Sequence, residues 1–211
     1  ASQFRPSAAK AVYDMYESEK VLDMSMGWGD RLSGFCATKY GRTYFGCDPN
    51  KNLEDGYNQQ AAYYGQQDQF FIFDDCAAEE TKIALKNHFD LAFTSPPYYI
   101  IERYTRESNQ SWVRYKKLKD WLEKFLFVSV DKQIDALKDN GVLAINISDV
   151  YCNHTINNIC DPLIEHVKKS GKMSDVSYLG IRMAKRMNSK SDREGTFCEP
   201  LFIWHKMPNW I

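Results

Sequence analysis

The sequence predicts an α/β domain with a mainly parallel sheet. Short apolar runs typical of strands alternate along the chain with segments whose apolar residues recur at helical spacing, the pattern of strands joined by crossover helices. The chain has 211 residues, of which 44% are hydrophobic and 14% aromatic, enough for a domain with a substantial core. We find no internal repeats, and we therefore expect residues 1–211 to form a single domain.

The expected strands are apolar runs rich in β-branched and aromatic residues and bounded by glycine, proline or polar residues. The run Phe89–Phe93 ends in two prolines, and Gly141–Ile147 has the composition of a buried strand. The expected strands span 21–24, 43–47, 69–73, 89–93, 141–147, 176–179 and 201–204.

The expected helices have apolar residues at intervals of three and four. The first is expected to begin with Ser7 as N-cap and to bury Ala8 and Val12. Between Leu118 and Leu137 the helical spacing continues over a long segment, with room for one interruption. The expected helices span 7–18, 31–40, 51–64, 78–87, 118–137 and 155–170.

Charge and cysteine content limit the classes of function. The 27 basic and 28 acidic side chains nearly balance, which argues against tight nucleic-acid binding by this domain alone. The six cysteines form no C-x-x-C pair and no zinc-like spacing with histidine, so we expect free thiols in a reducing, cytoplasmic compartment and no metal site. No apolar run approaches the ~20 residues of a membrane span, so no membrane partner is expected.

A rigid turn follows the fourth expected strand and reads Thr94-Ser95-Pro96-Pro97-Tyr98-Tyr99. Proline lacks the N–H and fixes φ, and Pro97 forces Pro96 into an extended conformation, so neither sheet nor helix can continue. Carboxyl ends of strands are where open α/β sheets bind ligands. Ser95 and the Pro96 carbonyl can accept the N–H bonds of an amino group on a flat heterocycle while Tyr98 stacks on the ring. The alternative is a rigid loop with a packed tyrosine.

This turn resembles the catalytic motif of the DNA methyltransferases that methylate N4 of cytosine or N6 of adenine with S-adenosylmethionine (SAM). Members of that family carry Asp, Asn or Ser before Pro-Pro-Tyr or Pro-Pro-Phe, and the serine form is more similar to the cytosine branch. The resemblance implies that Ser95, Pro96, Pro97 and Tyr98 are the catalytic residues. No covalent nucleophile is needed, and the chain has no Pro-Cys dipeptide of the kind that ring-carbon cytosine methylation requires.

The resemblance spans nearly the whole chain, because 98–104, 137–149 and 199–206 are similar to the loop and core strands that follow the motif in this family. It implies a Rossmann-like SAM-dependent methyltransferase fold, with a mainly parallel seven-stranded sheet flanked by helices. It also implies DNA as the partner and a bacterial or viral setting.

A glycine turn follows the first expected strand and reads Asp23-Met24-Ser25-Met26-Gly27-Trp28-Gly29. Glycines allow a backbone to approach a nucleotide closely, although a plain tight turn has the same sequence. The segment is similar to the first motif of the family, which implies that Asp23, Met26, Gly27 and Gly29 line the methionine part of SAM. Many relatives have an aromatic residue where this chain has Ser25.

Acidic residues follow the second and third expected strands. Asp48 lies roughly 20 residues beyond the glycine turn, where a carboxylate accepts bonds from ribose hydroxyls. A helix N-terminal aspartate is the alternative. After the third strand, the resemblance implies that Asp75 accepts the adenine amino group of SAM, with Asp74 or helix capping as alternatives.

Three further cofactor contacts are implied by the resemblance. Phe4-Arg5-Pro6 is similar to an N-terminal motif whose backbone and aromatic ring cover the cofactor, which implicates Phe4 and Pro6. A hydrophobic staple on the first helix is the alternative. Thr94, the last residue before Ser95, is the third expected contact.

Two basic stretches lie near the expected site. We predict phosphate contacts by Arg103, Arg106, Lys185, Arg186 and Lys190, with a solvated charged surface as the alternative. No target-recognition domain is recognisable in the sequence. Base choice is therefore expected from loops such as 99–117 and 182–197, or from a separate domain or subunit.

The leading expectation is a DNA methyltransferase that acts on cytosine N4. Adenine N6 is the nearest alternative. Two others remain open: a non-catalytic methyltransferase-like subunit of a larger DNA-modification or replication complex, and a methyltransferase acting on RNA or protein.

Overall fold

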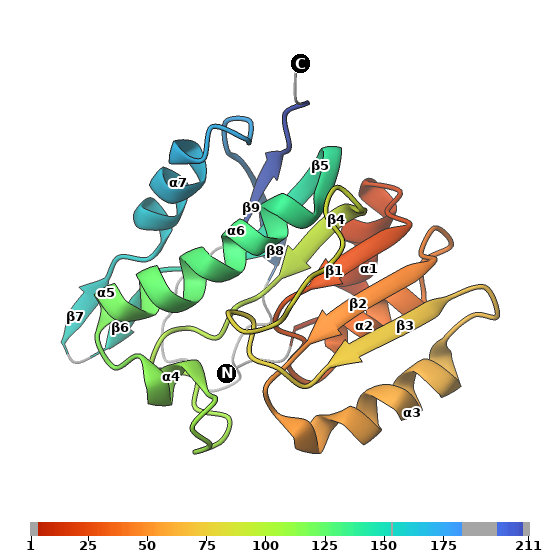
Figure 1. Ribbon diagram of the computed structural model, residues 1–211, viewed down its shortest axis with the longest axis horizontal. Helices are drawn as coiled ribbons and strands as arrows, with labels where there is room; N and C mark the ends of the chain where they lie inside the picture. Colours follow the sequence, from red (N-terminus) through yellow and green to blue (C-terminus); the bar gives the residue numbers. More distant parts are fainter. Residues whose placement is uncertain (1–3, 153, 183–197, 209–211) are drawn as a thin grey trace, which may run out of the picture.

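The computed structural model describes residues 4–152, 154–182 and 198–208, and a twisted sheet forms its centre (Figure 1). The strands of this sheet are β1 (Lys20–Asp23), β2 (Thr43–Cys47), β3 (Phe70–Asp74), β4 (Phe89–Thr94), β5 (Leu137–Asn146), β8 (Ser177–Arg182) and β9 (Cys198–His205). A separate two-stranded hairpin consists of β6 (Val150–Cys152) and β7 (Thr155–Asn157). All seven strands expected from the sequence are present, with shifted ends.

The sheet has the strand order β3-β2-β1-β4-β5-β9-β8. The pairs β3–β2, β2–β1, β1–β4 and β4–β5 are parallel, whereas β9 runs antiparallel to both β5 and β8. The prediction of a mainly parallel seven-stranded sheet is therefore confirmed. From β1 the chain builds outward to β2 and β3 on one side and then to β4 and β5 on the other. The carboxyl ends of β1 and β4 therefore form the switch point at which such sheets bind ligands.

Helices cover both faces of the sheet (Figure 1). They are α1 (Pro6–Met15), α2 (Asp30–Cys36), η1 (Lys51–Leu53), α3 (Glu54–Tyr64), α4 (Ser111–Arg114), α5 (Leu118–Trp121), η2 (Leu122–Leu126), α6 (Phe127–Ala136) and α7 (Cys160–Lys169). One core cluster joins α1, α2 and α3 to the sheet through residues such as Tyr13, Phe35 and Tyr57. A second joins α5, α6 and α7 to the opposite face through residues such as Trp121 and Leu163. In the described part of the chain, no helix has the length and apolar character to cross a membrane.

The expected long helix 118–137 is present with one interruption. Its middle turn, η2, is a π-helix, which widens the helix locally and places Phe125 toward the carboxyl ends of the strands. Such π segments are rare and are often found beside functional sites.

The expected helix 78–87 is absent, and this prediction was wrong. Residues 78–80 form a turn, and the segment continues without helix to β4. The reason lies in a tertiary contact, because the ammonium group of Lys132 on α6 binds the carbonyl oxygens of Ala78, Glu79 and Thr81 at 3.4, 2.6 and 2.9 Å. Those carbonyls point at one cation instead of along a helix axis.

Two helix starts and two helix ends also differ from the prediction, and one of these ends is that of the first helix, which ends at Met15 and not at residue 18. The first helix begins at Pro6, a good N1 residue because it has no N–H to leave unpaired, and Ser7 is not its N-cap. The last helix begins at Cys160 rather than 155, because residues before it form the β6–β7 hairpin. Asp149 accepts the N–H groups of Ile159 and Cys160 at 2.7 and 2.9 Å and so fixes this later start. The second helix ends at Cys36, earlier than the expected residue 40.

Candidate active site

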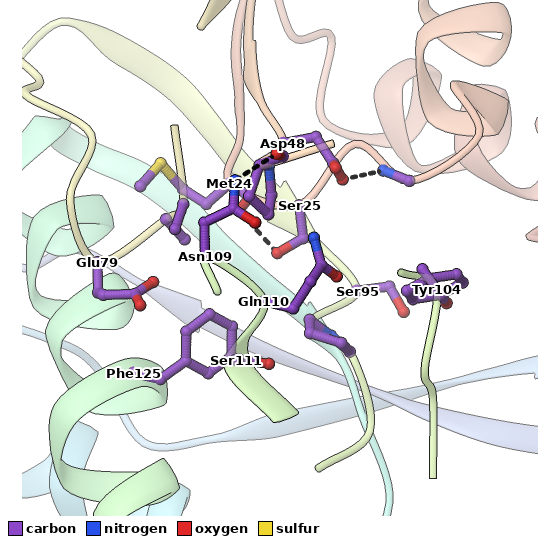
Figure 2. Close-up of a pocket in the computed structure, with 15 residues that line it drawn as sticks. Met24, Ser25, Asp48, Glu79, Ser95, Tyr104, Asn109, Gln110, Ser111 and Phe125 are labelled. Atoms are coloured by element: carbon purple, nitrogen blue, oxygen red, sulfur yellow. Dashed lines mark hydrogen bonds between the residues drawn. The ribbon is translucent and has the colours of Figure 1, made fainter. Parts of the chain in front are cut away.

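A pocket of about 500 Å³, open on one side to solvent, lies at the carboxyl ends of the parallel strands (Figure 2). The pocket is lined by Met24, Ser25, Gly27, Asp48, Pro49, Ala77, Ala78, Glu79, Ser95, Pro97, Tyr104, Asn109, Gln110, Ser111 and Phe125. Both motifs singled out in the sequence therefore contribute to one site.

The glycine turn presents its backbone to the pocket. Gly27 and Gly29 have φ angles of +56° and +82°, which favour glycine over residues with a side chain. No atom lies within 4 Å of the position that a Cβ on Gly27 would occupy, so this face of the turn is open to a ligand. Gly29 is covered instead by the side chain of Gln60 and does not line the pocket.

Asp48 lies where β2 ends and faces the pocket. Its carboxylate accepts the N–H of Gly27 at 2.9 Å and the N–H of Asn50 at 3.0 Å, one on each oxygen. Burial raises the pKa of Asp48 to about 6, against the lowering effect of these two hydrogen bonds. The carboxylate is thus held rigidly at the wall, as the predicted contact to ribose hydroxyls requires.

Asp23 lies beneath the glycine turn and not in the pocket wall. It is fully buried and accepts two bonds from the Arg31 guanidinium at 2.9 and 3.1 Å, together with the Tyr44 hydroxyl at 2.6 Å. It also accepts the Ser25 N–H at 3.2 Å. Met26 is likewise buried in the core, against Gly46. The predicted contacts of Asp23 and Met26 with methionine are therefore not prepared by this geometry.

The N-terminal motif packs beside the turn. The Phe4 ring contacts the edge of Phe93 with 5.6 Å between ring centroids, and the Arg31 guanidinium lies 5.4 Å from the Phe4 centroid. Pro6 is exposed as the first residue of α1. Neither residue lines the pocket, and their contact with the cofactor stays a prediction.

Ser95 and Pro97 line the pocket where β4 ends, and Pro96 is buried between them. The Ser95 hydroxyl donates to Asn146 Oδ1 on β5 at 3.4 Å. That oxygen is identified as the acceptor because Nδ2 of the same amide donates to the Pro200 carbonyl at 2.9 Å. The hydroxyl proton of Ser95 therefore points at Asn146, which leaves the oxygen lone pairs available to accept a bond from a ligand.

Tyr98 packs against the core and does not line this pocket. Its N–H donates to Glu102 at 3.0 Å, and burial together with the neighbouring Glu199 and Glu102 carboxylates raises the pKa of its hydroxyl. Tyr104 is the tyrosine beside Ser95 at the pocket (Figure 2). Stacking of Tyr98 on a base stays a prediction.

Asp75 lies outside the pocket. Its carboxylate pairs with the Lys51 ammonium at 2.7 Å, and this neighbour lowers the pKa of Asp75. The ligand atoms of Asp74, Asp75 and Cys76 lie within 4.8 Å of one another, but the ion pair with Lys51 already accounts for the Asp75 charge. The acid after β3 that lines the pocket is Glu79, four residues later, which the sequence analysis did not single out.

Residues 103–115, called the cover segment below, fold over the pocket. Asn109 Nδ2 donates to the Pro49 carbonyl at 2.7 Å, which ties the segment to the end of β2. At its other end the Arg114 guanidinium and the Tyr115 hydroxyl each donate to Glu79 Oε1 at 3.1 Å. Arg114 also pairs with Glu80 at 2.8 Å. Asn109 and Gln110 thereby become pocket residues, which no sequence pattern indicated.

The residues predicted to bind phosphate fall into two groups. Arg103 and Arg106 are exposed on the cover segment, and the Arg103 guanidinium lies 5.2 Å from the centroid of the Trp112 ring. Lys185, Arg186 and Lys190 lie outside the described residues, so the predicted role of that stretch stays a prediction.

Unpaired polar atoms gather around the pocket. Among the described residues, the buried side-chain atoms without a hydrogen-bond partner include Glu79 Oε2, Asn109 Oδ1, Gln110 Nε2 and Thr94 Oγ1. The first three belong to lining residues and the fourth to the residue before Ser95. Buried polar groups are normally paired, so this clustering indicates a site built for a polar ligand. Together with the open backbone at Gly27 and the acid at Asp48, it fits a nucleoside cofactor.

The fold and site have the features of a SAM-dependent methyltransferase: the strand order, the glycine turn, the acid after β2 and the pocket between them. Solved structures of that class share the fold. A SAM-dependent O-methyltransferase from Thermotoga maritima has a TM-score of 0.62 and 12% identity, over 100% of this chain and 69% of that chain. A tRNA methyltransferase from Aquifex aeolicus has a TM-score of 0.63 and 10% identity, over 99% of this chain and 71% of that chain.

An rRNA methylase from Streptococcus thermophilus is similar over 99% of this chain and 100% of that chain, with a TM-score of 0.58 and 14% identity. At these identities the likeness shows the fold alone. The family model described as DNA methylase matches residues 89–210, more than half of the chain. The chain therefore belongs to this family of amino-group DNA methyltransferases, and its cofactor is SAM. No curated protein matches it in sequence.

Proposed function

We propose that the protein transfers the methyl group of SAM to the exocyclic amino group of a base in DNA, with cytosine N4 as the target. The observation that carries this proposal is the position of Ser95 at one end of the pocket, next to Tyr104 (Figure 2). A base amino group placed there would lie against an oxygen acceptor and close to the cofactor site.

The cofactor supplies an electrophilic methyl group on a sulfonium, and the protein supplies orientation. An exocyclic amino group is a poor nucleophile because its lone pair is delocalised into the ring. Ser95 Oγ and the Pro96 carbonyl would accept its two N–H bonds and direct the nitrogen lone pair at the methyl carbon. The cofactor would supply the methyl carbon by giving up its C–S bond, and the nitrogen held by Ser95 and Pro96 would form the new N–C bond and lose a proton to solvent. Such positioning and electrostatic pairing can lower the barrier by several kcal/mol.

Asn146 supports Ser95 as an acceptor. Its Nδ2 donates to the Pro200 carbonyl, and its Oδ1 accepts a hydrogen bond from the Ser95 hydroxyl. The lone pairs of the serine oxygen are therefore free to accept a bond from the ligand. A neutral hydroxyl suffices for cytosine, whose ring is also the smaller of the two candidates. These two points favour cytosine over adenine.

Analysis of methylated nucleosides tests the proposal directly. The protein is incubated with SAM and DNA or RNA, and each product is digested and resolved by mass spectrometry. N4-methylcytosine in DNA is expected, lost in S95A and retained in S7A, which alters an exposed serine on α1. N6-methyladenine as the sole DNA product would overturn the base assignment, and methylation of RNA alone would overturn DNA as the substrate. Cofactor binding without any transfer would indicate a non-catalytic subunit.

A further inference from the structure

Three side chains at the pocket each have a buried polar atom without a hydrogen-bond partner in the protein. Asn109 donates through Nδ2 to Pro49, which leaves Oδ1 unpaired. Glu79 accepts Arg114 and Tyr115 on Oε1, which leaves Oε2 unpaired. Gln110 is 5% exposed and its Nε2 is unpaired. A buried polar atom is unfavourable if nothing pairs with it, so the three together point to a ligand.

The order of residues along the pocket indicates which part of SAM these atoms would meet. In Figure 2, Glu79 and Phe125 lie at one end, Ser95 and Tyr104 at the other, and Asp48 between them. The reacting methyl must lie at the Ser95 end, and the ribose is expected at Asp48. Because the ribose separates the sulfonium from the adenine, the adenine must extend toward Glu79.

We propose that Glu79, Asn109 and Gln110 form the adenine-recognition subsite for SAM, in the place that the sequence analysis gave to Asp75. The inference rests on the proposed function only for the location of the methyl group. The adenine amino group offers N–H donors, which suit the acceptors Glu79 Oε2 and Asn109 Oδ1. The ring nitrogens are acceptors, which suit the Gln110 amide N–H.

Asp75 is poorly placed for this role. Its side chain is 40% exposed, pairs with Lys51 and is absent from the pocket wall. Glu79 takes its place because the segment after β3 is a turn anchored by Lys132 and not a helix. The same anchor fixes the backbone that carries Glu79.

The test compares two ligands that differ at the adenine edge. S-adenosylhomocysteine carries the 6-amino group, whereas S-inosylhomocysteine carries an oxygen there and a proton on N1. Binding of each is measured by titration calorimetry, without DNA. The wild-type protein should prefer the adenosyl ligand by about 10- to 100-fold, the effect of a hydrogen bond to a charged group. E79Q converts the free acceptor into a donor while keeping one oxygen for Arg114 and Tyr115, and it should reduce this preference about tenfold or more.

Two matched variants serve as controls. D75N removes the acid predicted from the sequence, and E80Q removes the other carboxylate partner of Arg114; both should keep the wild-type preference. If E79Q unfolds, Q110L carries the test, with affinity for S-adenosylhomocysteine reduced about tenfold and the thermal midpoint of the free protein unchanged. An unchanged preference in E79Q, unchanged affinity in Q110L, or a preference lost in D75N would overturn the subsite. Because no DNA enters the assay, failure of the proposed methylation reaction would leave these results unaffected.

Discussion

The ionised carboxylate of Asp48 should lower the free energy of unfolding at neutral pH, and the same charge should favour cofactor binding. Burial raises its pKa from 3.8 to about 6. Well below pH 3.8 the carboxyl group is protonated in both the folded and the unfolded state and has no effect. Above about pH 6 it is ionised in both, and the folded state bears the full desolvation penalty, so stability falls as the pH rises through this window. At 1.36 kcal/mol per pKa unit, the difference corresponds to about 3 kcal/mol.

D48N removes this titration. The variant also loses one of the two acceptor oxygens that bind the N–H groups of Gly27 and Asn50, but that loss does not depend on pH. Comparison of two pH values therefore isolates the ionisation. The free energy of unfolding of D48N, relative to wild type, should increase by about 2 kcal/mol between pH 4 and pH 7, because part of the titration lies below pH 4.

Urea unfolding at pH 4, 5, 6 and 7 measures this difference. D55N, which removes an exposed aspartate on α3, controls for the general effect of one less negative charge. Calorimetry should show that wild-type affinity for SAM falls as the pH drops below 6, because ribose hydroxyls bind the ionised carboxylate best, and that D48N binds weakly at every pH. Parallel pH profiles for D48N and wild type would refute the argument.

Two further predictions concern residues that do not line the pocket. R31M should destabilise the fold by about 3–5 kcal/mol in urea unfolding, because it leaves the Asp23 carboxylate buried without its cation. The double variant D23L/R31M should lose less stability than the sum of the losses in the two single variants. Additive losses would contradict the pairing of Asp23 with Arg31. Single replacement of Cys76, Cys152, Cys160 or Cys198 by serine should leave methyl transfer intact. Burial raises the pKa of Cys160 to about 12 and that of Cys36 to about 11, so neither thiol is ionised at neutral pH. A loss of turnover in a folded cysteine variant would instead indicate a mechanism that uses a thiol.

The strands were predictable because each is a buried apolar run whose pattern is local. Examples are Val142–Ile145 and Leu91–Phe93, whose residues are all buried. A short run that is apolar at every position is typical of a buried strand. The pocket was predictable only in part. Gly27, Asp48 and Ser95 follow directly after strands, and parallel strands bring their carboxyl ends to one edge. These residues therefore meet once the sheet is correct.

The other lining residues come from segments whose shape depends on contacts far along the chain. The wrong helix at 78–87 and the prediction of Asp75 rest on the same local pattern, since a helix after β3 would leave the acid at the strand end as the natural candidate. Lys132 on α6, some fifty positions later, determines the turn instead. Asn109 and Gln110 lie in a segment without hydrophobic periodicity, so only the hydrogen bonds to Pro49 and Glu79 show that it covers the pocket.

The aspartate of the glycine motif can be explained by its contacts. A buried ion pair is a weak source of stability, because the desolvation of both charges offsets their attraction. Arg31, however, donates both to Asp23 and to the Ser25 carbonyl, while Asp23 accepts the Ser25 N–H. The main chain of Ser25 is thus held through both its N–H and its carbonyl, two residues before Gly27. We infer that Asp23 determines the shape of the turn and that the open backbone of Gly27, not the Asp23 carboxylate, meets the cofactor. In that case R31M should weaken SAM binding as well as folding, although Arg31 lies outside the pocket wall.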